Sequence, residues 1–455
     1  QRRGMIIFRN RRNVHTIPIM LSGISFTIFL FFSFKEKPFR FSKIRAVHQA
    51  NYCSSYSSYC KREVINSELN AVESSFFGDY ENTMRYATEN AQALSLQPVF
   101  TGSTSKKEVI KKLEMLLRDS TISDERKLDY QRLLKVLGRQ EDLQTLFQSF
   151  AAVDAKEYII QEAGNYHYLL LNEAHYSSQN RAFTADLLKP LWKKGYRYLA
   201  LEALAYSDTS LNERGYPVYN TGYYLQDPVF GNMIREAIQI GYKIVPYESQ
   251  NGSNGTERDF EQAKNIYENT WGKDTIGKVV IHAGYGHILE TGAPSYQPMG
   301  KQLKVLAGQD ILTVDQERMT NFLDESKLNP YYSFVKSQLG IDHPIIFLNG
   351  ESLVDPLSYG GIDLQVYHPP TTFIYGRPSW LLRPPYRIVP LPKDFFRFVG
   401  QLVEVKNKEE VRHSIPVDRT IIRSGVGLVL PAGEYKIGII DCDGSLIAEC
   451  NLSVK

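Results

Sequence analysis

The chain has 455 residues, which exceeds one average domain and predicts two or three. Hydrophobic residues make up 43% of it and charged residues 23%, proportions that are typical of a globular protein. The formal net charge is only +3 and no Lys/Arg face is clustered, which excludes a protein that binds nucleic acid through a broad basic surface.

Residues 1–45 have the pattern of a membrane anchor or an uncleaved signal. The stretch from Ile17 to Phe34 is apolar and uncharged, and it approaches the roughly 20 residues that cross a bilayer. Basic residues lie on both sides of it, so charge does not set its orientation. No small-residue cleavage site of the A-x-A kind follows. We therefore expect a protein that contacts the membrane through this segment, either anchored there or exported to the cell envelope.

Residues 46–160 are predicted to be helical, because apolar residues recur at spacings of three and four. Gly78-Asp79 is expected to break the helical pattern. One predicted helix includes residues 133–136, and another runs from Leu143 through Phe150 to Val153. The region contains no recognisable chemical motif. We predict a helical region that supports the rest of the chain or binds a partner.

The four cysteines leave the redox compartment open. Cys442 and Cys450 flank a hairpin turn, and the register of that hairpin places Cys450 opposite Ile437. A bond between these two cysteines is therefore not expected. Cys53 and Cys60 are close enough in sequence to pair across a Ser/Tyr loop.

Residues 161–385 alternate short apolar runs with helical patterns. This alternation predicts an α/β domain with a mostly parallel sheet flanked by helices. Gly195 and Gly241 each follow a helical pattern, as glycine commonly does just past a helix C-terminus. The predicted strands are residues 168–171, 198–201, 243–247, 278–281, 311–314 and 344–348.

Residues 386–455 change character to short alternating runs separated by turn signals. This pattern predicts a small all-β module that resembles a sandwich. The Pro-rich stretch 378–392 is the predicted linker between the two domains.

Polar side chains gather at the carboxyl ends of the predicted parallel strands, where such sheets bind ligands. Carboxylates and imidazoles that pack together shift one another's pKa values, as acid–base and metal sites require. The alternative is a polar network that only satisfies the mouth of the sheet. Gly284 and Gly286 are expected to provide sharp backbone turns that aim a histidine into the cleft. The gathered residues are Glu173, His175, Glu202, Glu248, His282 and His287.

The segment 206–227 is polar, rich in tyrosine and too long for a simple connection. Loops of this length in a compact domain are usually functional or disordered. We predict that Arg214-Gly215-Tyr216-Pro217 and Tyr223-Tyr224 line a pocket together with Glu248.

These motifs resemble a superfamily that contains the erythromycin esterases, the ChaN-like haem-binding lipoproteins, and the TraB and Tiki proteins. Asn172-Glu173-Ala174-His175 is similar to its first motif, Gly-Glu-x-His or Gly-x-x-His after a strand. Glu202 is similar to its middle Glu, and Gly284-Tyr285-Gly286-His287 to its late Gly-x-x-His. Arg258 and the helix after it resemble an Arg-containing helix start of the esterase and ChaN branches. The likeness covers roughly residues 160–320.

Asn172 departs from the family pattern, because it stands where the first motif has Gly. Asn tolerates left-handed backbone, so the turn is expected to survive the change. A close approach of a ligand to that backbone is harder to accommodate.

The resemblance implies a hydrolase of an ester or amide bond in a small molecule or a peptide. His175 would be the general base, oriented by Glu173 or Glu202, while His287 or His282 acts as acid or stabilises the oxyanion with Arg258. A divalent metal held by His175, Glu202 and His287 is a variant of this reading. The competing classes are a surface protein that binds haem or a metal without turnover and a structural surface protein whose site has decayed.

Overall fold

The computed structural model describes residues 14–21, 24–31, 38–50, 52–53, 56, 59–60, 67–94, 106–120, 127, 143–292, 295–349, 351–352 and 361–455. Val14–Leu21 (β1) and Ile24–Phe31 (β2) pair as antiparallel strands. The flanking basic residues at 2–12 and at 35 and 37 lie outside the described ranges. Among the described residues, no helix combines the length and apolar character that crossing a bilayer requires. The anchor stays a prediction.

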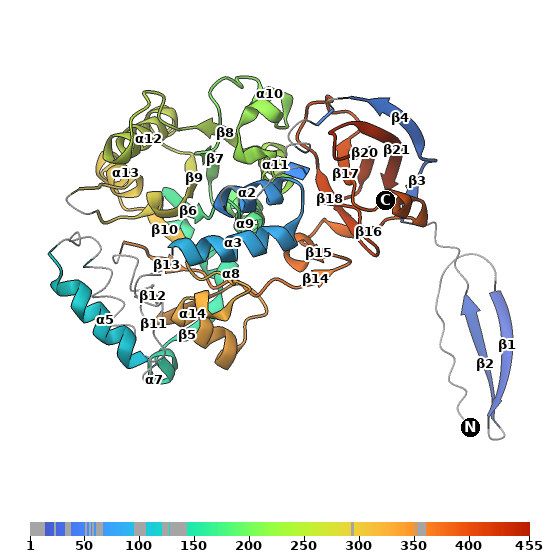
Figure 1. Cartoon of the computed structure of the whole chain (residues 1–455), viewed down its shortest axis with the longest axis horizontal. Coiled ribbons are helices and arrows are strands. Elements are labelled where there is room, and N and C mark those ends of the chain that lie inside the picture. The colour runs from blue at the N-terminus through green and yellow to red at the C-terminus, as the bar shows by residue number, and fades with distance from the viewer. Residues whose placement is uncertain are drawn as a thin grey trace.

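A six-stranded parallel sheet forms the centre of the α/β part, which confirms the predicted fold class at this level (Figure 1). Its strand order is β13-β10-β6-β9-β7-β8, and every neighbouring pair is parallel. Five of the predicted strands lie in it, and the short β13 was not predicted. The strands are β6 (Tyr168–Glu173), β7 (Tyr196–Leu201), β8 (Lys243–Pro246), β9 (Lys278–Gly284), β10 (Leu312–Asp315) and β13 (Leu364–Gln365).

Helices cover both faces of this sheet, because successive strand residues point to opposite sides and both sets are apolar. Leu169 and Val280 belong to a core shared with α8 (Ala155–Glu162), α9 (Ser178–Lys193) and α11 (Pro228–Ile240). Leu170 and Ile281 belong to a core shared with α12 (Gly255–Asn269) and α13 (Met299–Ala307).

The same alternation sorts the polar residues at the strand ends. Glu173 and His282 follow the pattern of the α9/α11 face, and Glu202 follows the pattern of the α12/α13 face. The predicted polar cluster therefore has two halves, one supplied from each face of the sheet.

One predicted helix and one predicted strand have a different place in the structure. The helix α7 (Leu143–Gln148) ends before Phe150, and Val153 lies in a strand, β5 (Ala151–Asp154). The predicted strand at 344–348 is β11 (Ile345–Asn349), which pairs antiparallel with β5 and with β12 (Glu351–Ser352) in a separate sheet. Val153 pairs with Ile346 across that sheet. This tertiary pairing, which suits β-branched side chains, overrides the helical spacing.

The helices before the sheet include α2 (Ser67–Phe76), α3 (Tyr80–Leu94) and α5 (Lys106–Arg118). The α2 and α3 helices pack on each other and lie across the middle of the molecule (Figure 1). Gly78, which was expected to break the helical pattern, separates them with a φ of +64°. A Cβ there would also lie 1.9 Å from the Arg419 carbonyl oxygen of the C-terminal module. The helix predicted around 133–136 lies outside the described residues.

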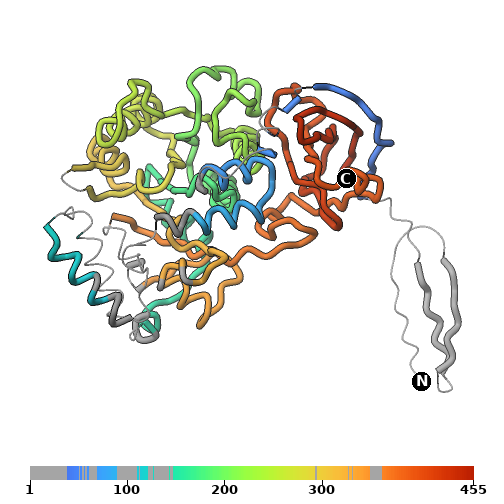
Figure 2. Tube along the Cα trace, viewed as in Figure 1, coloured from blue at the N-terminus to red at the C-terminus, as the bar shows by residue number. Residues whose placement is uncertain are grey.

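The C-terminal module is all-β, as predicted, but it contains strands from the other end of the chain. Phe39–Phe41 (β3) and Arg45–Gln49 (β4) pair antiparallel with β21 and run along its outer side (Figure 2). The strand β4 thus crosses the boundary that we predicted at residue 45. The module's own strands are β16 (Arg387–Pro390), β17 (Leu402–Asn407), β18 (Asp418–Ile421), β19 (Gly427–Leu430), β20 (Gly433–Ile440) and β21 (Leu446–Val454).

The Pro-rich stretch 378–392 packs against both domains and is not an open linker. It contains part of a short antiparallel pair, β14 (Phe373–Ile374) with β15 (Arg377–Pro378), and then β16. The guanidinium of Arg383 binds Glu236 of α11 at 2.9 Å. The prediction of a linker came from composition, because proline breaks regular structure. The stretch is nevertheless packed, since its residues Leu381 and Leu391 are buried.

The cysteines pair differently from the expectation. Cys60 forms a disulfide with Cys442, with their Cα atoms 5.5 Å apart, and Cys53 and Cys450 are buried elsewhere. Cys450 does lie opposite Ile437, as the hairpin register predicted. The Cys53–Cys60 pairing was wrong because β3, β4 and Cys60 pack onto the module, which sequence spacing does not reveal.

Candidate active site

A cavity of about 400 Å³ opens at the carboxyl ends of the parallel strands. Seven of the predicted site residues and Tyr224 line it, and Arg214 and Tyr223 do not. The lining residues are Glu173, His175, Glu202, Ala203, Tyr224, Phe230, Glu248, Arg258, His282, Ala283, Gly284, Tyr285 and His287.

Glu173, the last residue of β6, is the centre of the first half of the site. Its side chain is 3% exposed and receives two hydrogen bonds from Arg181 of α9, from Nε and Nη2, both at 2.6 Å. Burial alone would raise the pKa of the Glu173 carboxyl. The charge and hydrogen bonds of Arg181, with those of His175 and His282, outweigh burial and hold this pKa well below its ordinary value. Glu173 is therefore a fixed carboxylate.

His175 lies between this carboxylate and the cavity. Its Nδ1 is 3.3 Å from Glu173 Oε1. Its ring stacks on Tyr224 with centroids 4.1 Å apart and meets the edge of Tyr285 at 4.9 Å. Among the described residues, no hydrogen bond reaches its Nε2. In the neutral ring with the proton on Nδ1, Nε2 is a proton acceptor that faces the cavity.

His282 has protein partners on both ring nitrogens. Its Nε2 lies 2.8 Å from Glu173 Oε2, and its Nδ1 lies 3.2 Å from the Thr184 hydroxyl. The ring is 2% exposed. With both nitrogens engaged inside the protein, His282 is placed to hold Glu173 in position. The prediction that it acts as acid or oxyanion donor does not fit these contacts.

Arg258 is the centre of the second half of the site. It donates from Nη2 to Glu202 Oε1 at 2.7 Å and to Glu248 Oε2 at 2.5 Å, and from Nε to Glu248 Oε1 at 2.9 Å. Its Nη1 lies 3.1 Å from His287 Nε2. A guanidinium has five N–H groups. The fifth, on Nη1, has no acceptor among the described residues and lies in the cavity wall.

His287 is held by the same kind of pair as His175. Its Nδ1 lies 3.0 Å from Asp259 Oδ2, and Asp259 also accepts from Tyr296 Oη at 2.7 Å and from the Met299 amide at 2.9 Å. Burial lowers the pKa of His287, but the hydrogen bond that its ring donates to Asp259 and the charges of Glu202 and Asp259 outweigh it. The net effect raises the pKa above 6.5.

The motif glycines act in a different way from the expectation. Gly284 has an ordinary φ of −78°, and Tyr285 takes the left-handed conformation at +44°. Gly284 is needed for space, since a Cβ there would lie 2.4 Å from His175 Cε1 and 3.3 Å from Glu202 Oε2. Its amide donates to Glu202 Oε2 at 2.6 Å. The two halves of the site thus meet over this glycine.

Asn172 does not adopt a left-handed backbone, since it lies within β6. Its side-chain amide donates to the Tyr285 carbonyl at 2.9 Å and to Asp315 of β10, and its oxygen accepts from the Gln316 amide at 2.8 Å. Asn172 therefore joins β6 to β10 and to the turn after β9. A glycine at this position has no side chain to make these bonds.

Arg214 and Tyr223, two of the predicted pocket residues of segment 206–227, lie elsewhere. Arg214 pairs with Asp208 at 2.6 Å. The Tyr223 side chain points toward α2, where its ring meets Phe76 at 5.3 Å, and its residue is 46% exposed. The next residue, Tyr224, lines the cavity instead. In an irregular loop no periodicity tells which of two adjacent tyrosines points inward.

A divalent metal does not fit the three predicted ligands. Among the described residues, no group of three or more His, Cys, Asp or Glu is arranged to hold a metal ion. The guanidinium of Arg258 already lies between Glu202 and His287. It already pairs with the negative charge of Glu202 and with the lone pair of His287 Nε2, and a metal at this place would need both.

Sequence reasoning missed Arg181, Asp227 and Asp259. Arg181 is 0% exposed, joins Glu173 to Asp227 through a 2.8 Å bond from Nη1, and donates to the His175 carbonyl at 2.6 Å. It follows the first histidine of the motif by six residues, on a helix whose other face is apolar. No local pattern marks such an arginine as a site residue, because arginine is seldom fully buried.

No family model and no curated protein matches the chain. Solved structures with some likeness include the type III effector HopBA1, at 10% identity over 35% of this chain and 81% of that chain, with a TM-score of 0.27. RRSP, a MARTX toxin effector domain from Vibrio vulnificus, is 14% identical over 59% of this chain and 64% of its own, with a TM-score of 0.27. A structure described as bacterial protein toxins has 14% identity, 57% and 65% coverage and the same TM-score. Overlaps this small carry no argument about function.

Proposed function

We propose that the protein is a hydrolase of an ester or amide bond, with His175 as its general base. The observation that carries the proposal is the placing of one imidazole between a buried, permanently ionised Glu173 and an open cavity. A base must be held in one tautomer with its accepting nitrogen toward the substrate, and the Glu173 contact to Nδ1 supplies both.

In the proposed reaction, Nε2 of His175 takes a proton from a water molecule whose oxygen attacks the carbonyl carbon. The carbonyl oxygen becomes an oxyanion, which accepts a hydrogen bond from the fifth N–H of Arg258, on Nη1. The C–O or C–N bond then breaks, and the proton returns to the leaving group. The products are a carboxylic acid and an alcohol or amine.

The proton that reaches the leaving group comes from His175 or from His287. The raised pKa of His287 keeps a larger share of it protonated near neutral pH than an ordinary histidine. In the protonated ring Nε2–H faces Glu202 Oε1 at 3.7 Å, and Arg258 must turn away from that nitrogen. Glu202 thus faces both His287 and Arg258, and the order of the motifs along the chain matches the order in the superfamily that the sequence resembles.

The test is a panel of small esters, amides and peptides offered to the purified protein, with and without a chelator. His175→Ala is expected to lower kcat by about 10²–10⁴-fold, the usual contribution of a positioned base. Glu202→Gln keeps the shape but removes the charge that holds Arg258 and is expected to lower kcat as well. His343→Ala is the matched control, since His343 is exposed and lies outside the cavity. The chelator is expected to change nothing, because Arg258 fills the place of a metal.

Equal rates in wild type and His175→Ala, with circular dichroism showing both folded, would eliminate the catalytic role. A wild type that is silent on the whole panel but binds haem in a His175-dependent way, seen by absorbance, would favour the binding protein instead.

A further inference from the structure

The segment 206–227 ends against the proposed base. Its residues Tyr224–Gln226 form a short 3₁₀ helix, and the Tyr224 ring lies parallel to the His175 ring, with 19° between the planes and 4.1 Å between centroids. Glu173 holds only Nδ1 of that histidine. The χ2 torsion of histidine is broad, so one contact at Nδ1 leaves the ring plane poorly defined. The stacked face of Tyr224 removes that freedom.

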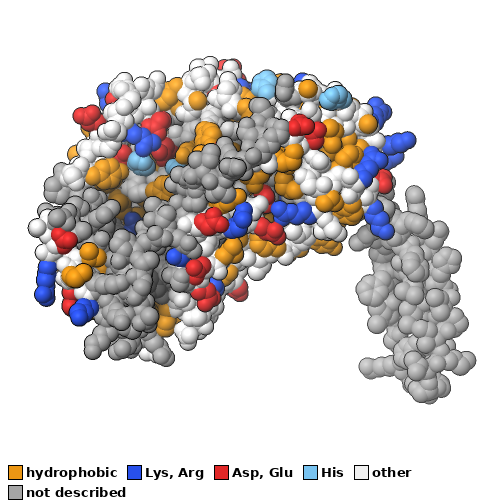
Figure 3. Space-filling view, viewed as in Figure 1, with side chains coloured by type: hydrophobic (Ala, Val, Ile, Leu, Met, Phe, Trp, Pro, Cys, Tyr) orange, Lys and Arg blue, Asp and Glu red, His pale blue; other side chains and the backbone are white. Residues whose placement is uncertain are grey.

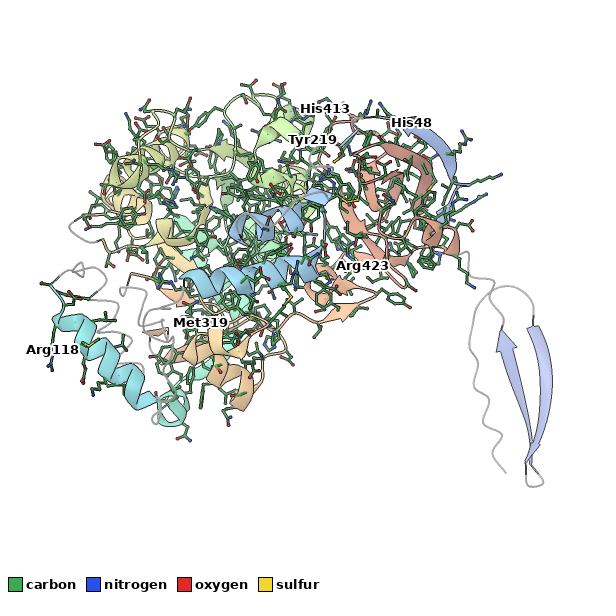
Figure 4. All side chains as sticks on the ribbon, in the orientation of Figure 1. His48, Arg118, Tyr219, Met319, His413 and Arg423 are labelled. Atoms are coloured by element: carbon green, nitrogen blue, oxygen red, sulfur yellow. A yellow bond between two sulfur atoms is a disulfide. The ribbon has the colours of Figure 1, made fainter. Side chains whose placement is uncertain are left out.

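The tyrosine is itself held by contacts on both sides of it in the chain. On one side the segment joins the C-terminal module, where Val218 bridges Ser414 and the Tyr219 amide donates to the His413 carbonyl at 3.1 Å. Figure 4 labels Tyr219 and His413 next to each other at this junction. On the other side Asp227 accepts from Arg181 at 2.8 Å.

A second support comes from the helices before the sheet. Tyr223 packs against Tyr224 at 5.3 Å and against Phe76 of α2 at 5.3 Å. A Cβ on Gly222 would lie 2.0 Å from the Ala203 carbonyl oxygen, so the segment passes close over the end of β7. The tyrosine has little room to leave the histidine.

We propose that Tyr224 is a positioning residue of the site: its ring fixes the plane of the His175 imidazole, and the C-terminal module and α2 hold it there. The proposal rests on the proposed function for its effect on turnover, but the geometry of the two rings exists without it. Its aromatic ring is what the role needs, so phenylalanine at this position is expected to serve as well.

The test compares Tyr224→Leu, Tyr224→Phe and the control Tyr216→Leu, whose tyrosine lies on the same segment but outside the cavity. The first readout is the ring-proton resonance of His175 in histidine-labelled protein, assigned by its loss in His175→Ala. A stacked aromatic ring shifts this resonance upfield. Tyr224→Leu is expected to move it downfield, while Tyr224→Phe and Tyr216→Leu leave it in place. The second readout is kcat, which is expected to fall by about 10²-fold in Tyr224→Leu alone.

An unmoved His175 resonance in folded Tyr224→Leu would overturn the proposal, and so would a resonance that moves equally in Tyr224→Phe. If Tyr224→Leu does not fold, Tyr224→Met takes its place with the same expected outcomes. The resonance decides whether the two rings stack even in a protein that turns over nothing on the panel, and kcat decides whether the stack positions the base. A silent panel with the expected resonance shifts counts against the proposed function and not against the stack.

Discussion

At the scale of single residues, Gly284 sets the distance between the two halves of the site. A methyl group there would come within 2.4 Å of His175 Cε1, while φ at −78° suits any residue. Gly284→Ala is therefore expected to push the His175 ring aside and abolish most turnover with a small change in Tm. The measurements are kcat and the Tm from thermal unfolding. Gly286→Ala is the control, since its nearest neighbour would lie 3.4 Å away. A large loss of stability with unchanged kcat would contradict the steric reading.

His287 is expected to make stability depend on pH. Its pKa in the folded protein is raised above 6.5, so its contribution is fully present below about 6.5 and is lost as pH rises through the raised value. His167 and His368 have lowered pKa values of about 4 and about 3, so their contributions change below 6.5. Urea unfolding at several pH values should show a steeper decline above 6.5 for wild type than for His287→Gln. Parallel declines would contradict the raised pKa.

Which site residues the sequence predicts depends on the local pattern that marks them. Glu173, Glu202 and His282 lie at or near the carboxyl ends of buried strands, and parallel strands bring these ends to one edge, so their meeting was predictable. Tyr224 was expected to line a pocket, but in an irregular segment no periodicity separates it from Tyr223. Arg181 lies in a helix, where nothing in one sequence marks a buried arginine, and it was missed.

At the scale of the elements, Asn172 joins three of them. It is 2% exposed, and its partner Asp315 is 0% exposed. Asn172→Gly, which restores the glycine of the superfamily motif, is expected to destabilise the protein by about 1–3 kcal/mol, because buried Asp315 loses the Asn172 donor and keeps only the longer bonds from the Glu317 and Arg318 amides. Asn172→Asp keeps the size of the side chain but places a second carboxylate beside Asp315, so we expect it to lose more stability than Asn172→Gly. This loss is expected to become smaller in acid, where a carboxylate is protonated. Denaturant unfolding measures both. A glycine variant as stable as wild type would show that Asp315 finds another donor.

The helices and strands of the sheet were predictable because two faces of apolar residues give long apolar runs. β5 and β11 were not placed, since their pairing joins residues 151–154 to 345–348 and no local pattern records it. The order of the strands in the parallel sheet is also not recorded in a local pattern, because it is set by how helices pack on the two faces.

At the scale of the whole molecule, residues 39–49 near the start of the chain and residues 446–454 near its end share one sheet. β3 and β4 cover the side of β21, the amide of Lys455 donates to the Pro38 carbonyl at 2.8 Å, and the Phe41 ring packs on Phe395 at 5.5 Å. Hydrophobic side chains lie over the module, with Lys and Arg along its outer edge (Figure 3). The module was predictable as all-β from its alternation, but short strands far away in sequence leave no such signal.

This arrangement predicts where the chain can be cut. A fragment of residues 51–455 lacks β3 and β4, so it exposes the backbone groups of nine-residue β21 and part of the module's apolar core. A fragment of residues 38–455 keeps both strands with their contacts to β21; among the described pairings it loses that of β1 with β2, which form a separate sheet. We expect 38–455 to unfold in one transition at high temperature, and 51–455 to unfold earlier and to aggregate. Differential scanning calorimetry and light scattering measure both, and Phe41→Ser in 38–455 is the matched control, expected to fall between them because it loses one packed ring but keeps the strand. Equal transition temperatures for 38–455 and 51–455 would contradict this prediction, because they would mean that β3 and β4 do not stabilise the module.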